Sequence, residues 1–101
     1  MLIYEIRKNT LHVRLTGELD HSACTRLRPE LDQLLSDRGI RRLIFDVTAL
    51  QFMDSSGIGL LLGRYKLLSR RGGSVAVRGA NARMDRVLRM AGVYQVIERL
   101  A

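Results

Sequence analysis

The chain has 101 residues, of which 47% are hydrophobic and 27% charged, and its formal net charge is +7 at neutral pH. This length suits one domain with its own core, which we expect to span residues 1–101, and the composition excludes a disordered or collagen-like chain. The longest apolar run, residues 58–62, is far shorter than the ~20 residues of a membrane-spanning helix. We therefore expect a soluble, cytoplasmic protein without membrane insertion.

The cysteine and histidine content argues against covalent cross-links and bound metals. The single Cys24 has no partner for an intramolecular disulfide, and His12 and His21 do not complete a set of zinc ligands. Cys24 is expected to be a small core residue. The sequence thus predicts neither a metal site nor a cofactor.

The positive charge invites a nucleic-acid interpretation, because Lys and Arg side chains neutralise phosphates. However, the 17 cationic residues are scattered along the chain. No zinc-finger, RNA-recognition or basic-zipper pattern accompanies them, and the few aromatic residues do not alternate with charge as a base-stacking surface requires. We therefore expect no direct contact with nucleic acid and interpret the arginines as a solvated surface.

The N-terminal part of the chain has the pattern of a β-hairpin. Apolar and polar residues alternate over residues 2–7 and 11–15, which predicts two half-buried strands. Asn9 and Thr10 are expected to form the tight turn between them, although this pair lacks the glycine typical of such turns. The two strands should pair antiparallel.

The apolar spacing then changes to that of one face of a first helix, with Asp20 or Ser22 as its N-cap. Pro29 lies inside this pattern and lacks the N–H group that an internal helical position needs. The spacing therefore predicts either a kink near Thr25 or a helix that begins only around Arg28.

The middle of the chain predicts a buried strand followed by a second helix. Gly39 is expected to end the first helix, and residues 41–47 form a nearly continuous apolar run typical of a central strand covered on both faces. Residues 58–68 carry a helical apolar stripe, with Arg64 and the following cations on or near its opposite face and at its C-terminal end. A pair of glycines, residues 72–73, should end this second helix.

The last third of the chain completes the expected fold. Residues 75–77 predict a strand, and Asn81 should cap a third helix that turns Val87 inward and ends at Gly92. Residues 93–100 fit either a last short strand or a tail. The order ββαβαβα(β) predicts an α/β fold with a small mixed sheet, in which the first strand is antiparallel, the later strands are parallel and helices pack against the sheet.

The stretch most suited to a functional role is residues 52–59, FMDSSGIG, which leads into the second helix. Two hydroxyls and a carboxylate lie where free N–H groups and the positive end of the helix dipole favour an anion. The stretch is no nucleophile elbow, because Met53 stands where Gly-x-Ser-x-Gly needs glycine, and the spacing of phosphate-binding loops is absent. The residues alone leave two interpretations open: helix capping by Asp54, Ser55 and Ser56, or a place for a phosphate.

The glycines of this stretch also have a simple structural interpretation. Gly57 and Gly59 lower helix propensity by about 1 kcal/mol each, but they allow a helix to lie close against the sheet or against the backbone of a partner.

Residues 17–21, GELDH, together with residues 52–66, FMDSSGIGLLLGRYK, resemble the STAS-domain anti-sigma factor antagonists, most closely those of sporulation. The resemblance in element order runs over essentially the whole chain and implies a STAS-type fold and a protein that is not an enzyme. It also implies that Ser55, the first serine after Asp54, is phosphorylated, with Ser56 the less favoured acceptor.

The resemblance implies a partner switch. The unphosphorylated protein would bind an anti-sigma factor with serine kinase activity and release the sigma factor, while phosphorylation on Ser55 would inactivate it until a serine phosphatase restores it. The kinase would supply ATP and Mg²⁺, because this chain has no evident phosphate-binding loop. The alternative is an antagonist or scaffold of another pathway, such as the general stress response.

The residues expected to contact the partner come from both resembling stretches. They are Glu18, Asp20 and His21 in the first stretch, and Asp54, Ser56, Gly57, Ile58 and Gly59 around Ser55 in the second. For Asp20, capping of the first helix is an equally expected role.

Overall fold

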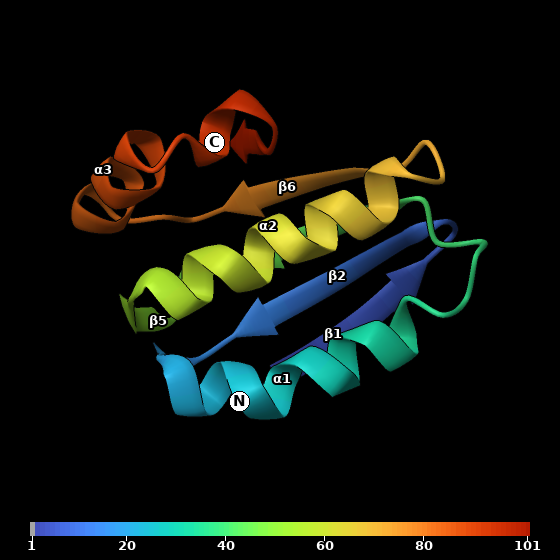
Figure 1. Ribbon diagram of the computed structural model, residues 1–101, viewed down its shortest axis with the longest axis horizontal. Coiled ribbons are helices and arrows are strands. Elements are labelled where there is room, and N and C mark those ends of the chain that lie inside the picture. Colours follow the sequence, from blue (N-terminus) through green and yellow to red (C-terminus); the bar gives the residue numbers. More distant parts are fainter. Residues whose placement is uncertain (1) are drawn as a thin grey trace.

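The computed structural model describes residues 2–101 as a twisted sheet with two long helices, α1 and α2, lying across one face (Figure 1). In chain order the elements are β1 (Leu2–Arg7), β2 (Thr10–Leu15), β3 (Gly17–Leu19), α1 (His21–Leu34), β4 (Arg42–Asp46), β5 (Leu50–Met53), α2 (Ser55–Ser69), β6 (Ser74–Arg78), α3 (Ala82–Met90), the 3₁₀ turn η1 (Val93–Gln95) and β7 (Glu98–Leu100).

The main sheet has five strands in the order β1-β2-β4-β6-β7, with β1 antiparallel to β2 and the other neighbours parallel. The predicted fold class is therefore confirmed. The structure adds a second sheet that the sequence pattern did not indicate, in which β3 and β5 pair parallel. The last stretch, left open between strand and tail, contains the short strand β7.

The β1-β2 turn lies one residue earlier than predicted. Arg7 pairs with Thr10, so the two-residue loop consists of Lys8 and Asn9, and Thr10 belongs to β2. Lys8 has a φ of 56°, the left-handed conformation that such short loops require. The prediction of an Asn9-Thr10 turn was wrong by one position.

Strand β1 is much more exposed than the predicted half-buried strand. Ile3, Tyr4 and Ile6 are all exposed, although Tyr4 points to the helix-covered face beside Val13. The reason is that β1 is the outermost strand of the sheet. Its apolar side chains therefore lack a covering neighbour on one side.

Helix α1 runs through Pro29 without interruption, so the prediction of a start around Arg28 is wrong. Asp20 is the N-cap and accepts a hydrogen bond from the N–H of Ala23 at 2.9 Å, which decides between the two candidate caps. Pro29 has no N–H to donate to the Thr25 carbonyl, and both residues are exposed on the outer side of the helix.

The inner face of α1 packs on the sheet as predicted, but the helix ends earlier. Cys24 is buried, and burial is the main cause that raises the pKa of its thiol. The helix ends at Leu34, and the Ser36 hydroxyl donates to the carbonyl of Gln33 at 2.6 Å. Gly39 lies in the following turn, so the prediction that it ends the helix was wrong.

Strand β4 is central, as predicted, but helices cover only one of its faces. Phe45 belongs to the hydrophobic core beneath the helices, whereas Ile44 points to the opposite face of the sheet. On that face long side chains replace a helix layer: Arg42 donates to the Ser74 hydroxyl at 3.0 Å and to the Glu98 carboxylate at 2.9 Å. The expectation of cover on both faces was wrong in this respect.

The buried face of α2 differs from the predicted stripe. It consists of Gly57, Leu60, Leu61, Arg64 and Leu68, and Arg64 was expected to point outward. Arg64 is only 8% exposed, and its Nε lies 3.2 Å from Asp32 Oδ1 of α1. Arg64 falls on the helix face that packs on the sheet and α1, so its charge is compensated across the helix pair.

The C-terminal part follows the prediction with one difference. Asn81 caps α3 by accepting from the N–H of Met84 at 2.8 Å, and Gly92 follows the helix with a φ of 78°. Val87, expected to point inward, is 37% exposed. Helix α3 lies at the end of the sheet and buries only Met84 and Leu88.

A cluster around Asp85 ties α3 to the last strand. The Asp85 carboxylate accepts from the Tyr94 hydroxyl at 2.7 Å and from Arg99 Nε at 2.8 Å. The hydrogen bond from Tyr94 is the main cause that lowers the pKa of Asp85 to about 2, and the bond from Arg99 adds to it. Burial and the Asp85 carboxylate raise the pKa of Tyr94 to about 12.

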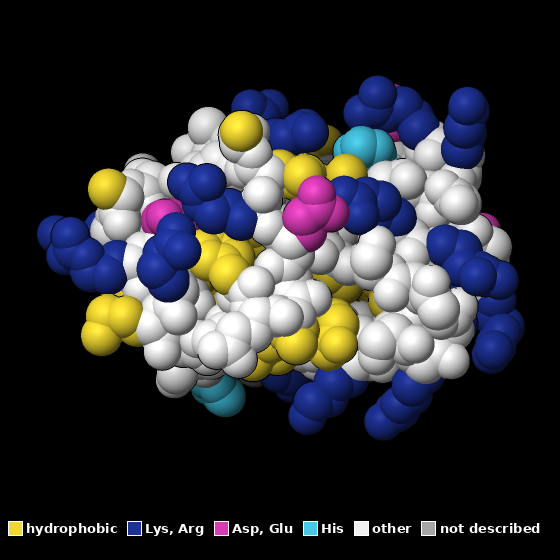
Figure 2. All heavy atoms as spheres, turned by 90° about the horizontal axis from the view of Figure 1, so that it is seen from above, with side chains coloured by type: hydrophobic (Ala, Val, Ile, Leu, Met, Phe, Trp, Pro, Cys, Tyr) yellow, Lys and Arg dark blue, Asp and Glu magenta, His cyan; other side chains and the backbone are white. Residues whose placement is uncertain are grey.

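Figure 2 shows the side of the molecule that faces upward in Figure 1. Lys and Arg side chains are spread around this face among small hydrophobic patches and do not gather in one stripe.

Candidate functional site

The pairing of β3 with β5 brings the two motif-bearing stretches together. Leu19 pairs with Met53, and each of these residues is followed directly by the aspartate that caps a helix, Asp20 for α1 and Asp54 for α2. Since the two strands are parallel, both helices begin at the same end of the molecule (Figure 1). The candidate site lies at this end, around the first turns of α1 and α2.

Asp54 fixes the start of α2. Its Oδ1 accepts hydrogen bonds from the N–H groups of Ser56 at 2.9 Å and Gly57 at 3.4 Å, and its own N–H donates to the Leu19 carbonyl at 3.4 Å. The capping interpretation of Asp54 is therefore confirmed. The same contacts hold the first turn of α2 in a defined position against β3.

The two serines of the motif have different surroundings. Ser55, the first residue of α2, is exposed, whereas Ser56 is half-buried. The Ser56 Oγ lies 3.4 Å from Nδ1 of His21, the first residue of α1. One hydroxyl thus faces solvent, and the other is turned toward the neighbouring helix.

The two glycines also differ. A side chain at Gly57 would place its Cβ 2.5 Å from Cγ of Met53 and 3.0 Å from Cδ2 of Leu19, so this glycine lets α2 sit directly on β3 and β5. Gly59 is exposed, and a Cβ there would meet nothing within 4 Å. The close-packing interpretation is thus confirmed at Gly57. Gly59 leaves the outer face of α2 flat.

The remaining predicted contact residues lie at the same end of the molecule. Glu18 is exposed on β3, opposite Phe52 of β5. Asp20 is half-buried and serves as the cap of α1, the alternative role expected for it. Ile58 is half-buried and packs against the core. Gly57 is buried, so it supports the surface from below.

The sequence pattern did not single out an apolar hollow between β5 and α3. It measures about 160 Å³ and is lined by Gln51, Phe52, Met53, Asn81, Arg83, Met84 and Val87. Phe52 of β5 is 48% exposed. Its exposure follows from its place in the short second sheet, which no local pattern indicates. An exposed aromatic next to such a hollow is a candidate contact for another protein.

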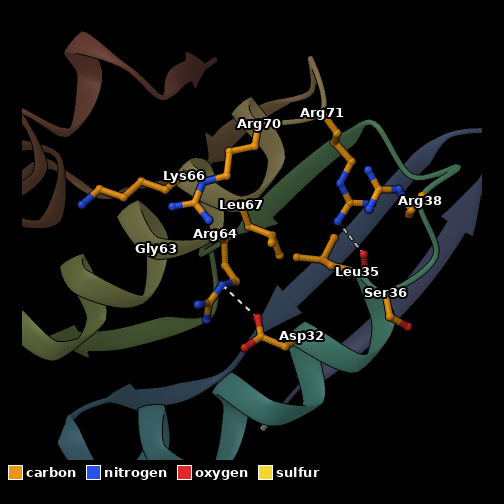
Figure 3. Close-up of a pocket in the computed structure, with 10 residues that line it drawn as sticks. All are labelled: Asp32, Leu35, Ser36, Arg38, Gly63, Arg64, Lys66, Leu67, Arg70 and Arg71. Atoms are coloured by element: carbon orange, nitrogen blue, oxygen red, sulfur yellow. Dashed lines mark hydrogen bonds and ion pairs between the residues drawn. The ribbon is translucent and has the colours of Figure 1, made fainter.

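A wider hollow lies at the other end of α2, between its last turns and the end of α1 (Figure 3). Arg71 donates there to the carbonyl oxygens of Leu35 at 2.5 Å and Asp37 at 3.0 Å, so it fixes the chain that leaves α1. Lys66 and Arg70 extend from the last turns of α2, where positive charge suits the helix dipole. This basic end is about 20 Å from Ser55, given the rise of ~1.5 Å per helical residue.

Clusters of potential metal ligands and membrane-spanning helices are both absent from residues 2–101. Within that range no group of three or more His, Cys, Asp or Glu side chains could hold a metal ion. Nor is any helix formed by these residues long and apolar enough to cross a membrane.

Comparison with known proteins connects this site to a family. The family model for the STAS domain matches residues 1–101. The chain is 40% identical over 93 residues to the anti-sigma F factor antagonist of Paenibacillus polymyxa, covering 92% of this chain and 80% of that protein. It is 28% identical over 92 residues to the anti-sigma-B factor antagonist of Bacillus subtilis, covering 90% and 82% of the two chains.

Solved structures of the antagonist SpoIIAA show the same fold. The unphosphorylated form aligns with a TM-score of 0.77 at 31% identity over 89% of this chain and 83% of that one. The phosphorylated form, from Bacillus, aligns with a TM-score of 0.79 at 28% identity over 100% and 92% of the two chains.

The chain therefore belongs to the STAS domain family. Within that family its function is that of the anti-sigma factor antagonists, and the expected resemblance to stage II sporulation protein AA is confirmed. These antagonists are regulatory proteins and not enzymes.

Proposed function

We propose that this antagonist is switched by phosphorylation of Ser55. In the unphosphorylated state it binds an anti-sigma factor that is also a serine kinase, and a sigma factor is released. Transfer of a phosphoryl group from ATP, held with Mg²⁺ by the kinase, inactivates it, and a serine phosphatase restores it. The switch operates in the cytoplasm and controls transcription in sporulation.

The observation that carries this proposal is the exposed Ser55 hydroxyl at the capped start of α2. A similar chain, SpoIIAA, is known in both a phosphorylated and an unphosphorylated form. A partner can reach Ser55 without disturbing the core, because the cap of α2 is made by Asp54 and not by this serine.

Charge explains why the phosphate would break the complex. Phosphorylation adds about −1.5 to −2 charges and three strongly hydrated oxygens, which must lose water to enter an interface. The fold itself should tolerate the phosphate, since the helix dipole and the N–H groups at a helix start favour an anion. The expected result is loss of binding without unfolding.

The surface proposed for the partner surrounds Ser55 on several sides. Glu18 offers a carboxylate on β3 that can pair with a cation of the partner. Phe52 adds an exposed aromatic ring beside the hollow, and Gly59 lets a partner backbone approach α2 closely. Asp20, Asp54 and Gly57 hold these residues in place from within.

The test combines two variants of Ser55 with mapping of the phosphate. Mass spectrometry after incubation with the cognate kinase and ATP should locate the modification on Ser55. Ser55→Ala should still bind the kinase but accept no phosphate, while Ser55→Asp should lose binding with a melting temperature within a few degrees of the wild type. A Ser55→Asp protein that unfolds, or that binds as well as the wild type, would contradict the proposed switch.

A second candidate keeps the same chemistry in another pathway. The similarity to anti-sigma-B factor antagonists favours it, because those relatives act on a different sigma factor from the one named for the 40% identical protein. Binding of purified kinases from the two systems, measured side by side, separates the candidates. The proposed sporulation function requires the tighter complex with the anti-sigma F factor.

A further inference from the structure

We infer that His21 is a positioning residue that directs phosphoryl transfer to Ser55 by holding the hydroxyl of the neighbouring Ser56. This inference rests on the proposed function, because it concerns which of the two adjacent serines the kinase modifies. Its carrying observation is the 3.4 Å approach of Ser56 Oγ to His21 Nδ1, which links the starts of the two helices.

The strand register places His21 beside Ser56. Leu19 of β3 pairs with Met53 of β5. His21 lies two residues after Leu19, and Ser56 lies three residues after Met53. Each strand is followed by a capping aspartate and then by its helix, so the first turns of α1 and α2 lie side by side. The sheet therefore sets the backbone positions of His21 and Ser56, and their side chains make the contact.

The backbone of Ser56 is held in place, which fixes the direction of its Cα–Cβ bond, and the rotamer at this bond places Oγ toward His21. Its N–H is held by the Asp54 carboxylate at 2.9 Å, and the next residue, Gly57, lies against Met53 with no room for even a methyl group. Successive side chains on a helix point about 100° apart, since a turn holds ~3.6 residues. Ser55 therefore lies on a different side of the helix from Ser56, and it is exposed to solvent.

The chemistry of transfer makes this difference matter. The Oγ of the accepting serine forms a bond to the γ-phosphorus of ATP, the bond from that phosphorus to the bridging oxygen of ADP breaks, and the hydroxyl proton passes to a base of the kinase. Ser55 can present its oxygen directly. Ser56 would first have to leave His21, and the kinase would have to reach it past the imidazole ring.

The test measures the distribution of phosphate between the two serines in the full-length protein. Wild type, His21→Ala, His21→Asn and His12→Ala are incubated with the kinase and ATP, and site-resolved mass spectrometry is performed at low conversion. His21→Ala should raise the share of phosphate on Ser56 about five-fold, the factor that corresponds to one net hydrogen bond. His21→Asn can place an amide group near the position of Nδ1 and should return the share to that of the wild type.

His12→Ala is the matched control, because His12 lies on the opposite face of the sheet from the helices. It should leave the distribution unchanged. Equal shares on Ser56 in wild type and His21→Ala, with Ser55 still modified, would overturn the inference and leave the proposed function intact. A wild-type protein modified on neither serine would instead overturn the proposed function, and the inference with it.

A second measurement needs no kinase. The ¹⁵N resonances of the His21 ring report whether Nδ1 makes a hydrogen bond. Ser56→Ala should shift them, and Ser55→Ala should not. Unchanged His21 resonances in Ser56→Ala would show that the contact is absent in solution and would overturn the inference.

Discussion

Replacing Gly57 with alanine would test how closely α2 sits on the small β3-β5 sheet. The added Cβ would lie 2.5 Å from Met53 Cγ and 3.0 Å from Leu19 Cδ2. Ordinary carbon contacts are about 3.5–4.0 Å, so Met53 or the helix must move by roughly 1 Å. Overpacking of this kind costs about 1–3 kcal/mol.

Gly59→Ala is the matched control, because it makes the same substitution two positions later in the same helix. A Cβ at Gly59 meets nothing within 4 Å, so this variant should only gain helix propensity, which stabilises by about 1 kcal/mol. Gly57→Ala gains a similar amount, and the gain cancels when the two variants are compared. The difference in their free energies of unfolding is then the overlap cost alone, about 1–3 kcal/mol with Gly57→Ala the less stable.

Urea unfolding followed by far-ultraviolet circular dichroism suits this comparison, since the chain contains no tryptophan. The melting temperatures should differ by about 5 to 20 °C for a domain of this size. The reasoning would be refuted if Gly57→Ala were as stable as Gly59→Ala, because α2 would then have room to move at its start and the first turn would not be held against β5.

Substitutions at three further positions probe other parts of the fold by the same unfolding measurement. Asp54→Ala should lose about 1 kcal/mol with its cap of α2, while Asp54→Asn, which keeps a capping oxygen, should lose much less. Pro29→Ala should stabilise the protein by about 2 kcal/mol, because it restores an N–H donor at an exposed helical position. An unchanged free energy of unfolding would contradict the idea that Pro29 weakens α1. The pKa of Asp85 is lowered from 3.8 to about 2, so its contribution to stability is present above pH 3.8 and is lost as the pH falls toward 2. Asp85→Asn should therefore be less stable at neutral pH but lose less stability across that acid range, and parallel curves for the two proteins would contradict this.

The parts of the fold that local chemistry determines were predictable. The helix that Asn81 caps, the strand around residues 75–77 and the left-handed Gly92 each depend on a few neighbouring residues, and all were confirmed. The central place of β4 followed equally from its apolar run, because such a run must be buried.

The errors have a common physical cause, which is tertiary packing. Arg64 was predicted to lie on the surface, but it pairs with Asp32 of α1, more than thirty residues away in the chain. The strand β5 and the exposed Phe52 on it were not predicted, because β5 has only four residues and shows no clear alternation. Neither the partner of a charge nor the cover of a strand can be read from the residues next to it.

The residues of the candidate site were predicted, but the strand pairing that brings them together was not. The family resemblance linked residues 17–21 with residues 52–66, and the expected parallel strands placed both at one end of the sheet, but the strand pairing that joins them was not predicted. The structure supplies this link in the pairing of Leu19 with Met53, both buried, which sets the two helix starts side by side. A shift of this register by one residue would turn the side chain of the shifted strand, Leu19 or Met53, out of the core, so burial opposes it. The position of His21 relative to Ser56 is therefore maintained by the same hydrophobic contacts that hold the fold together, and a switch built on Ser55 needs no separate device to keep its geometry.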